Sequence, residues 1–167
     1  VKALGIDHFR ELVEQEWKFI KDGPNTIDES ELKRVASFFT DPPYKESSKH
    51  NLNDYVDNKA FKQWLDRCTH PHKNKAYRSV TLSLKATHQA PGDATSEQMR
   101  LVADLADQYS FSEIRVSHEQ NLILADVQED DLFGLWEQAK SKNLATPNIG
   151  LLTDIICCPG GDFCSLA

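Results

Sequence analysis

The second half of the sequence is poor in positive charge, and the chain contains no long apolar run. Residues 79–167 hold five lysines and arginines against thirteen aspartates and glutamates. Such an acidic half argues against nucleic-acid binding, which needs cations facing the phosphates. No stretch of about 18 apolar residues is present, and no signal peptide is recognisable, so we expect no membrane span, no secretion and a cytoplasmic location.

Cysteine is also scarce, with four residues in 167. Three of the four are crowded into one short stretch, Cys157, Cys158 and Cys164. A disulfide framework spreads its cysteines along a small secreted chain, whereas this crowding is typical of metal chemistry in a reducing compartment.

The crowded cysteines flank a Pro-Gly-Gly turn. An apolar run ending at Ile156 leads into Cys157 and Cys158, and Cys164 follows after the two glycines. Thiolates bind soft metals and iron–sulfur clusters, and glycines let backbone amides approach a bulky cluster. The turn is therefore a candidate ligand-presenting loop. The alternative is that the three cysteines are small buried apolar residues.

Residues 1–76 are predicted to form a helical tail and linker. The second helix is expected to be capped by Asp28. The stripes of the three helices repeat at three- and four-residue spacing: Phe9, Val13, Trp17 and Ile20; Val35, Ala36 and Phe39; Phe61, Trp64, Leu65 and Cys68. Cys68 is thus predicted to be a core residue, and residues 69–75 to be a solvated linker.

The remaining pattern predicts a β-α-β-β-α order. Alternating residues indicate strands at 79–85, 113–117 and 121–125. A capping box of Thr95 and Gln98 is expected to open one helix, whose inner face holds Met99, Val102, Ala103 and Ala106. A second helix is expected to bury Leu132, Leu135, Trp136 and Ala139. A further apolar strand is expected at 149–156. The predicted fold class is α+β, an N-terminal helical segment followed by a ferredoxin-like half domain with a mostly antiparallel sheet and helices on one face.

One face of this sheet is expected to lack a helical cover. The two helices pack on the face that holds Val80, Leu82, Leu84, Ile114, Val116, Leu122 and Leu124 by parity. Lys85, Arg115 and Ser117 fall on the other face, which could hold an anionic group. The alternative is an ordinary solvated face on which Arg115 pairs with a surface carboxylate.

The cysteine spacing carries a family resemblance. Cys158-x5-Cys164 and the preceding residues 146–156 resemble the first half of the C-x5-C and C-x3-C signature of the siroheme- and 4Fe-4S-dependent nitrite and sulfite reductases. The resemblance implies that Cys158 and Cys164 are metal ligands of a 4Fe-4S cluster beside siroheme. The second cysteine pair lies downstream in that family, so we expect these 167 residues alone to carry no cofactor and to be inactive.

The same resemblance implies a domain plan and further site residues. Residues 77–148 would be a ferredoxin-like half domain that pairs with a second one, and residues 149–167 would begin the siroheme and 4Fe-4S domain. A strand and turn near the cofactor supply the other candidate cofactor-binding residues, Arg115, Ser117, Gln120 and Asn121. No catalytic residue is assigned.

The implied activity is the six-electron reduction of sulfite to sulfide or of nitrite to ammonia. Such a reductase acts on a small anion and takes electrons from ferredoxin or from a flavoprotein reductase subunit. The alternative is a stand-alone ferredoxin-like binding or regulatory module, whose C-terminal cysteines hold zinc or serve as a structural cluster.

Overall fold

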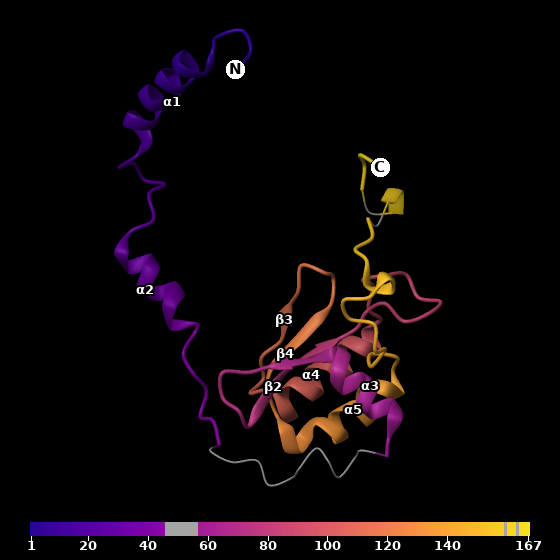
Figure 1. Ribbon diagram of the computed structural model, residues 1–167. Helices are drawn as coiled ribbons and strands as arrows, with labels where there is room; N and C mark the ends of the chain where they lie inside the picture. Colours follow the sequence, from indigo (N-terminus) through magenta and orange to yellow (C-terminus); the bar gives the residue numbers. More distant parts are fainter. Residues whose placement is uncertain (46–56, 159, 163) are drawn as a thin grey trace. The chain divides into compact units, whose positions relative to one another are not determined.

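The computed structural model describes residues 1–45, 57–158, 160–162 and 164–167 (Figure 1). The chain divides into two compact units, Val1–Pro42 and Pro43–Ala167. We expected the division near residue 76. It lies earlier because the third helix shares its core with the sheet of the second unit. None of the described helices is long and apolar enough to cross a bilayer.

The first unit contains two amphipathic helices, α1 (Ile6–Ile20) and α2 (Glu29–Ser37). The predicted cap of α2 is confirmed, since an Asp28 carboxylate oxygen accepts a hydrogen bond from the Glu31 amide at 2.8 Å. The Glu31 side chain pairs with Arg34. The apolar stripes are solvent-exposed, including Trp17, Ile20 and Phe39.

The second unit is built on a four-stranded antiparallel sheet in the order β1-β2-β4-β3. The strands β2 and β3 flank β4, which is the arrangement of a split β-α-β unit. The α+β, ferredoxin-like fold class is therefore confirmed. Its elements are β1 (Thr69–Pro71), β2 (Tyr77–Leu82), α4 (Ser96–Tyr109), β3 (Arg115–Val116), β4 (Leu122–Gln128) and α5 (Leu132–Ser141).

Three helices pack on one face of this sheet, and α3 (Lys59–Cys68) joins α4 and α5 there (Figure 1). Phe61 of α3 stacks on Trp64 and makes an edge contact with Phe133. The predicted stripes of α3 and α5 are confirmed, as is the capping box of α4. Met99 and Ala103 of α4, which we placed inward, are exposed, whereas Gln98 is buried.

Three strand predictions need correction. Residues 69–71 form the edge strand β1, because their backbone pairs with β2. The expected strand at 149–156 contains a 3-10 turn, Leu152–Asp154, and pairs with no described strand. Ile114 and Val116 were expected to be buried, yet Val116 is 79% exposed, because β3 is a two-residue strand at the sheet edge.

The predicted linker also contributes a partly buried histidine, His72. His72 Nδ1 lies 2.9 Å from the Asn74 amide, which donates to it. His72 Nε2 lies 3.0 Å from Asp126 Oδ1, and the Tyr44 hydroxyl donates to the same oxygen at 2.6 Å. This network fastens the start of the second unit to β4.

Candidate functional site

The polar face of the sheet is partly covered by the chain that follows α5. A cavity of about 230 Å³ lies between this face and the residues around Asp154. Residues of three strands, of the β3–β4 turn and of the covering segment line it: His70, Ser79, Thr81, Ser117, Glu119, Asn121, Ile123, Ile149, Gly150 and Asp154. The candidate site is therefore built from the sheet and from the segment that carries the cysteines.

Lys85 lies at the centre of this contact and is buried, which corrects the expectation that it faces outward. Its side chain is 2% exposed, and its Nζ donates to Asp154 Oδ1 at 2.8 Å and to the Asp154 carbonyl oxygen at 3.0 Å. It also donates to the Glu119 carbonyl oxygen. The ammonium thus has three acceptors for its three N–H groups. One of them is the Asp154 carboxylate, whose charge the ammonium neutralises.

Asp154 is the carboxylate that anchors the covering segment. Burial raises its pKa, but the hydrogen bonds from Lys85, Gly150 and Asn121 outweigh that effect and hold the pKa below its usual value. Asn121 Nδ2 donates to Oδ1 at 2.9 Å, and the Gly150 amide donates to Oδ2 at 2.9 Å. Asp154 is therefore ionised at neutral pH.

Two buried asparagines connect the sheet to the same segment. Asn121 is 1% exposed, and its Oδ1 accepts from the Leu84 amide at 3.1 Å. Asn148 accepts from the Ser83 hydroxyl at 2.8 Å and donates to the Lys85 carbonyl oxygen at 3.1 Å. The structure thus places the side chain of Asn121, a predicted cofactor contact, in bonds within the protein.

Gln120 joins the β3–β4 turn directly to the first of the crowded cysteines. Its Nε2 donates to the Cys157 carbonyl oxygen at 2.7 Å, and its Oε1 accepts from the Cys157 amide at 3.0 Å. The side-chain amide therefore pairs with both backbone polar groups of Cys157, as a neighbouring strand would. This contact lies one residue before Cys158.

The two predicted ligand cysteines flank a turn whose backbone suits sulfur. Cys158 is exposed and free, and the Gly160 amide lies 3.4 Å from its Sγ as a donor. The Cys164 amide donates to the Gly160 carbonyl oxygen at 3.0 Å. Gly160 has φ +66°, a conformation that favours glycine, and a Cβ there would meet nothing within 4 Å. The donor set fits two thiolates of an iron–sulfur cluster, whose sulfurs commonly accept N–H bonds.

The other two cysteines are placed differently. Burial raises the pKa of the Cys68 thiol to about 12, so this thiol is protonated at neutral pH and serves as a core residue, as predicted. Cys157 is half-buried. Within the part of the chain that the structure describes, no three His, Cys, Asp or Glu side chains gather closely enough to hold a metal ion.

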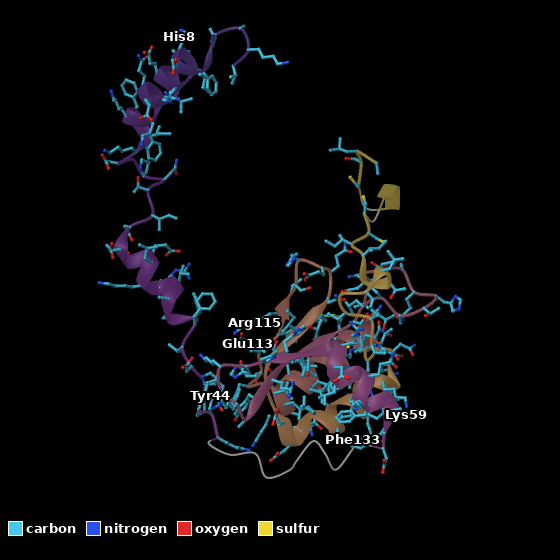
Figure 2. All side chains as sticks on the ribbon, viewed as in Figure 1. His8, Tyr44, Lys59, Glu113, Arg115 and Phe133 are labelled. Carbon is cyan, nitrogen blue, oxygen red and sulfur yellow. The ribbon has the colours of Figure 1, made fainter. Side chains whose placement is uncertain are left out.

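The remaining predicted cofactor residues lie on β3 and in the turn after it. Arg115 is exposed, and its Nε donates to Glu113 Oε1 at 2.5 Å (Figure 2). Ser117 Oγ accepts from the Asn121 amide at 3.2 Å and lines the cavity. His118 is largely exposed and pairs with Glu119. The structure therefore gathers Ser117, Gln120 and Asn121 at the covering segment, while Arg115 lies in a surface ion pair.

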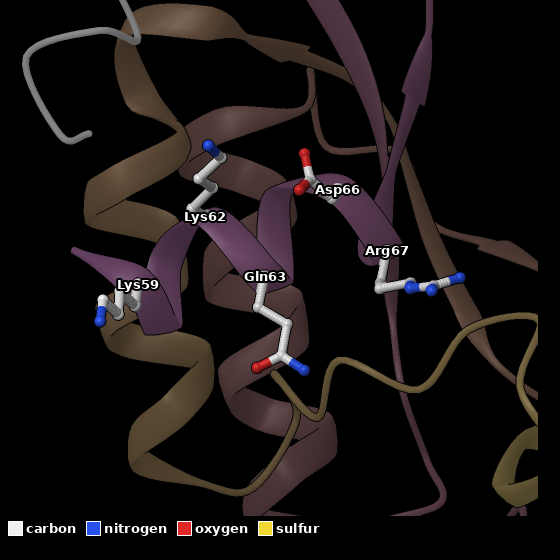
Figure 3. Close-up of a pocket in the computed structure, with 5 residues that line it drawn as sticks. All are labelled: Lys59, Lys62, Gln63, Asp66 and Arg67. Atoms are coloured by element: carbon white, nitrogen blue, oxygen red, sulfur yellow. The ribbon is translucent and has the colours of Figure 1, made fainter. Parts of the chain in front are cut away.

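A second depression lies on the exposed face of α3. Lys59, Gln63 and Arg67 follow one another along this face, with Lys62 and Asp66 beside them (Figure 3). The depression has a volume of about 400 Å³. It contains three cations and one carboxylate, so it suits an anionic surface rather than a metal ion.

The bonds of Asp154 predict acid sensitivity. A carboxylate whose pKa is lowered by folding stabilises the fold above its unfolded pKa, and this stabilisation is lost as the pH falls through the folded value. We therefore expect the urea midpoint of the second unit to fall below about pH 4. The Asp154→Asn variant should show a shallower decline between pH 5 and pH 2. Equal slopes in the two proteins would contradict the assignment.

Comparison with known proteins shows which sequences this chain is similar to. Residues 70–142 match the family model of the nitrite/sulfite reductase ferredoxin-like half domain. The chain is 30% identical over 171 residues to the chloroplastic ferredoxin–nitrite reductase of Betula pendula, covering 100% of this chain and 24% of that protein. It is 40% identical over 81 residues to the assimilatory ferredoxin-dependent nitrite reductase of Haloferax mediterranei, covering 47% of this chain and 13% of that protein.

The fold and the match together define a ferredoxin-like half domain with a cysteine-bearing extension. Residues 70–142 are thus similar to the half domain of the nitrite and sulfite reductase family, and the chain as a whole is similar to part of a ferredoxin–nitrite reductase. It spans about a quarter or less of the length of the curated relatives described above.

Proposed function

We propose that this chain is part of a siroheme- and 4Fe-4S-dependent reductase, with Cys158 and Cys164 as two of the cluster ligands. The observation that carries the proposal is the position of these cysteines. They follow the matched half domain on a segment that Lys85 and Gln120 fasten to its polar face.

The residues of this chain would bind and orient the cofactors. The two thiolates would hold one side of the cluster, and the Gly160 amide would donate to the Cys158 sulfur. When bound, the cluster and the siroheme supply the electron transfer and the metal centre that reduce the substrate. Arg115 and Ser117 remain proposed contacts to the siroheme, Arg115 only after exchanging its Glu113 partner.

Nitrite is the substrate that we favour, because the relatives reported above are named nitrite reductases. The test is to supply the longer protein containing this chain with reduced methyl viologen. Ammonium should form from nitrite faster than sulfide forms from sulfite. The opposite ranking would make sulfite the substrate, and no product from either anion would overturn the proposal.

Metal content distinguishes the proposed reductase from the alternative, a stand-alone zinc module. Two thiolates do not complete a tetrahedral zinc site, and the described residues offer no third close ligand. Anaerobic purification followed by iron, sulfide and zinc analysis distinguishes the two functions. Iron and sulfide without zinc are expected for the longer protein, whereas the 167 residues alone should retain neither cofactor and show no turnover.

Ferredoxin is the proposed electron donor, as the names of the relatives state for those proteins. A donor with an acidic surface would fit the cationic face of α3. A cytoplasmic location is part of the same proposal and can be checked by cell fractionation, since the Betula pendula relative is named chloroplastic.

Reversing two charges on α3 should weaken the use of ferredoxin. We expect Lys59→Glu/Lys62→Glu to raise the KM for ferredoxin several-fold at low salt and to leave turnover with methyl viologen unchanged. The small dye needs no docking surface. The matched control is Lys18→Glu/Lys21→Glu in the first unit, which changes the net charge equally. An unchanged KM in the α3 variant would remove this face from the docking site.

A further inference from the structure

The β3–β4 turn holds Gln120 in an unusual backbone conformation. Gln120 has φ +59°, in the left-handed region that favours glycine, and a side chain there strains the backbone. A glycine or an asparagine would meet the turn geometry at lower cost. The side chain of Gln120 must therefore contribute something that the turn itself does not need.

The contact that Gln120 makes supplies this contribution. Its carboxamide bonds both the amide and the carbonyl group of Cys157, at 3.0 Å and 2.7 Å. Both ends of the carboxamide are used on one residue, and the two backbone groups belong to the peptide units on either side of the Cys157 Cα, so rotation of either unit would break a hydrogen bond. The orientation of the Cys157 backbone is thereby fixed by a residue 37 positions earlier in the chain.

The surroundings of Gln120 restrict its side chain to this use. A Cβ added at Gly92 would lie 3.1 Å from Gln120 Cβ and 3.3 Å from Gln120 Cδ. The absence of a side chain at residue 92 therefore leaves space for the Gln120 side chain. Gly92 has φ +85°, and its amide donates to the Leu84 carbonyl oxygen at 3.0 Å, which ties this support to the end of β2.

A second fastening acts on the same segment three residues before Cys157. Lys85 bonds the Glu119 carbonyl oxygen in the turn and the Asp154 carboxylate in the segment. The covering segment is therefore bonded at Asp154, through Lys85, and again at Cys157, through Gln120. With two fixed points so close together, the path of the backbone into Cys158 has little freedom.

We propose that Gln120 is a positioning residue for the metal site: by clamping the backbone on both sides of the Cys157 Cα, it sets the direction in which Cys158 presents its thiolate. Cys157 then serves through its backbone, while its thiol is not a ligand. This inference rests on the proposed function, because it takes Cys158 to be a ligand of an iron–sulfur cluster. The Gln120 carboxamide acts on the cluster only through the cysteine segment.

The sharpest variant is Gln120→Asn, which keeps the carboxamide and suits a left-handed backbone but is one methylene too short for the clamp. Gln120→Gly removes the strain and the side chain together. The matched control is Gln138→Asn, because Gln138 uses its amide on the Tyr109 hydroxyl, away from the cysteines. All three are made in the longer protein, loaded anaerobically with iron and sulfide.

Three measurements then follow the cluster, the Cys157 backbone and the stability of the fold separately. We expect cluster loss to an iron chelator to become about tenfold faster in both Gln120 variants, as for lost supports of metal ligands elsewhere. Amide hydrogen exchange at Cys157 should also accelerate, while the thermal midpoint of the second unit stays close to that of the parent. The control should match the parent in all three measurements.

The outcomes separate this role from the proposed function. A parent protein that binds iron and sulfide, together with a Gln120→Asn variant that keeps them equally long and exchanges Cys157 equally slowly, overturns the positioning role alone. A parent that binds no cluster under any loading condition overturns the proposed function, and the positioning role with it.

Discussion

Replacing Lys85 with methionine is expected to destabilise the second unit by about 3–5 kcal/mol. The substitution keeps the volume of the side chain but leaves the buried Asp154 carboxylate without its counter-ion. It also leaves the Glu119 carbonyl oxygen without the Lys85 ammonium. Since small domains are stable by about 5–15 kcal/mol, much of the margin would be lost. Urea unfolding followed by tryptophan fluorescence measures the change.

The control for Lys85→Met is the same substitution at an exposed ion pair. Lys142 bonds Glu97 at 2.7 Å on the surface, so Lys142→Met should cost no more than about 1 kcal/mol. The double variant Lys85→Met/Asp154→Asn should recover part of the loss, because the buried carboxylate is removed too. Similar losses at Lys85 and Lys142 would mean that the ammonium of Lys85 is solvated in solution.

Loss of the iron–sulfur cluster is expected when either Cys158 or Cys164 is replaced with alanine in the longer protein. Each substitution removes one of the proposed thiolates, and a 4Fe-4S cluster is ordinarily held by four. Iron and sulfide content, together with the visible spectrum, should fall to background. Siroheme content should be measured in the same samples to separate loss of the cluster from misfolding.

The two other cysteines of this chain provide internal controls. Cys68→Ala should leave the iron content unchanged, because its protonated thiol is buried and donates to the Thr146 carbonyl oxygen at 3.3 Å. Its cost should appear in stability instead, at about 1–2 kcal/mol for a small core side chain. Cys157→Ala should also keep the cluster. If Cys157→Ala loses iron while Cys158→Ala keeps it, the ligand assignment is reversed.

Local signals in the sequence were sufficient for the helical layer of the second unit. The Thr95 and Gln98 pair predicted the α4 capping box, and Phe61 and Trp64 predicted the buried side of α3. These features depend on residues three or four apart. The spacing that identifies these features in the sequence also brings the residues together on one helix face, so distant contacts are not needed to predict them.

The same reasoning failed for Lys85 because strand parity gives a face but not what covers it. Parity placed Lys85 on the face away from the helices, and that face is buried by a segment almost 70 residues later. Asp154, in an apolar run, was a usable signal, since a carboxylate among apolar residues needs a cationic partner. The clamp formed by Gln120 had a weaker signal, because nothing in its neighbourhood indicates a bond to Cys157.

The failure at residues 149–156 has a related cause. Apolar content predicted a strand, but a buried strand needs a free sheet edge at which to pair. The edge beside β2 is occupied by β1, and the backbone of the segment is held by side chains such as Asn148 and Asp154. Competition for an edge is decided by the whole topology, which short sequence windows do not contain.

The early position of β1 also decides the order of events during protein synthesis. In a β-α-β-β-α-β unit the sheet waits for a final strand after the second helix. Here β1 precedes β2, so every strand of the described sheet has been translated before α5. At an elongation rate of about 5–20 residues per second, Cys157, Cys158 and Cys164 leave the ribosome after the residues of the sheet and the β3–β4 turn. These three thiols are thus synthesised after the strands and the turn to which their segment is bonded.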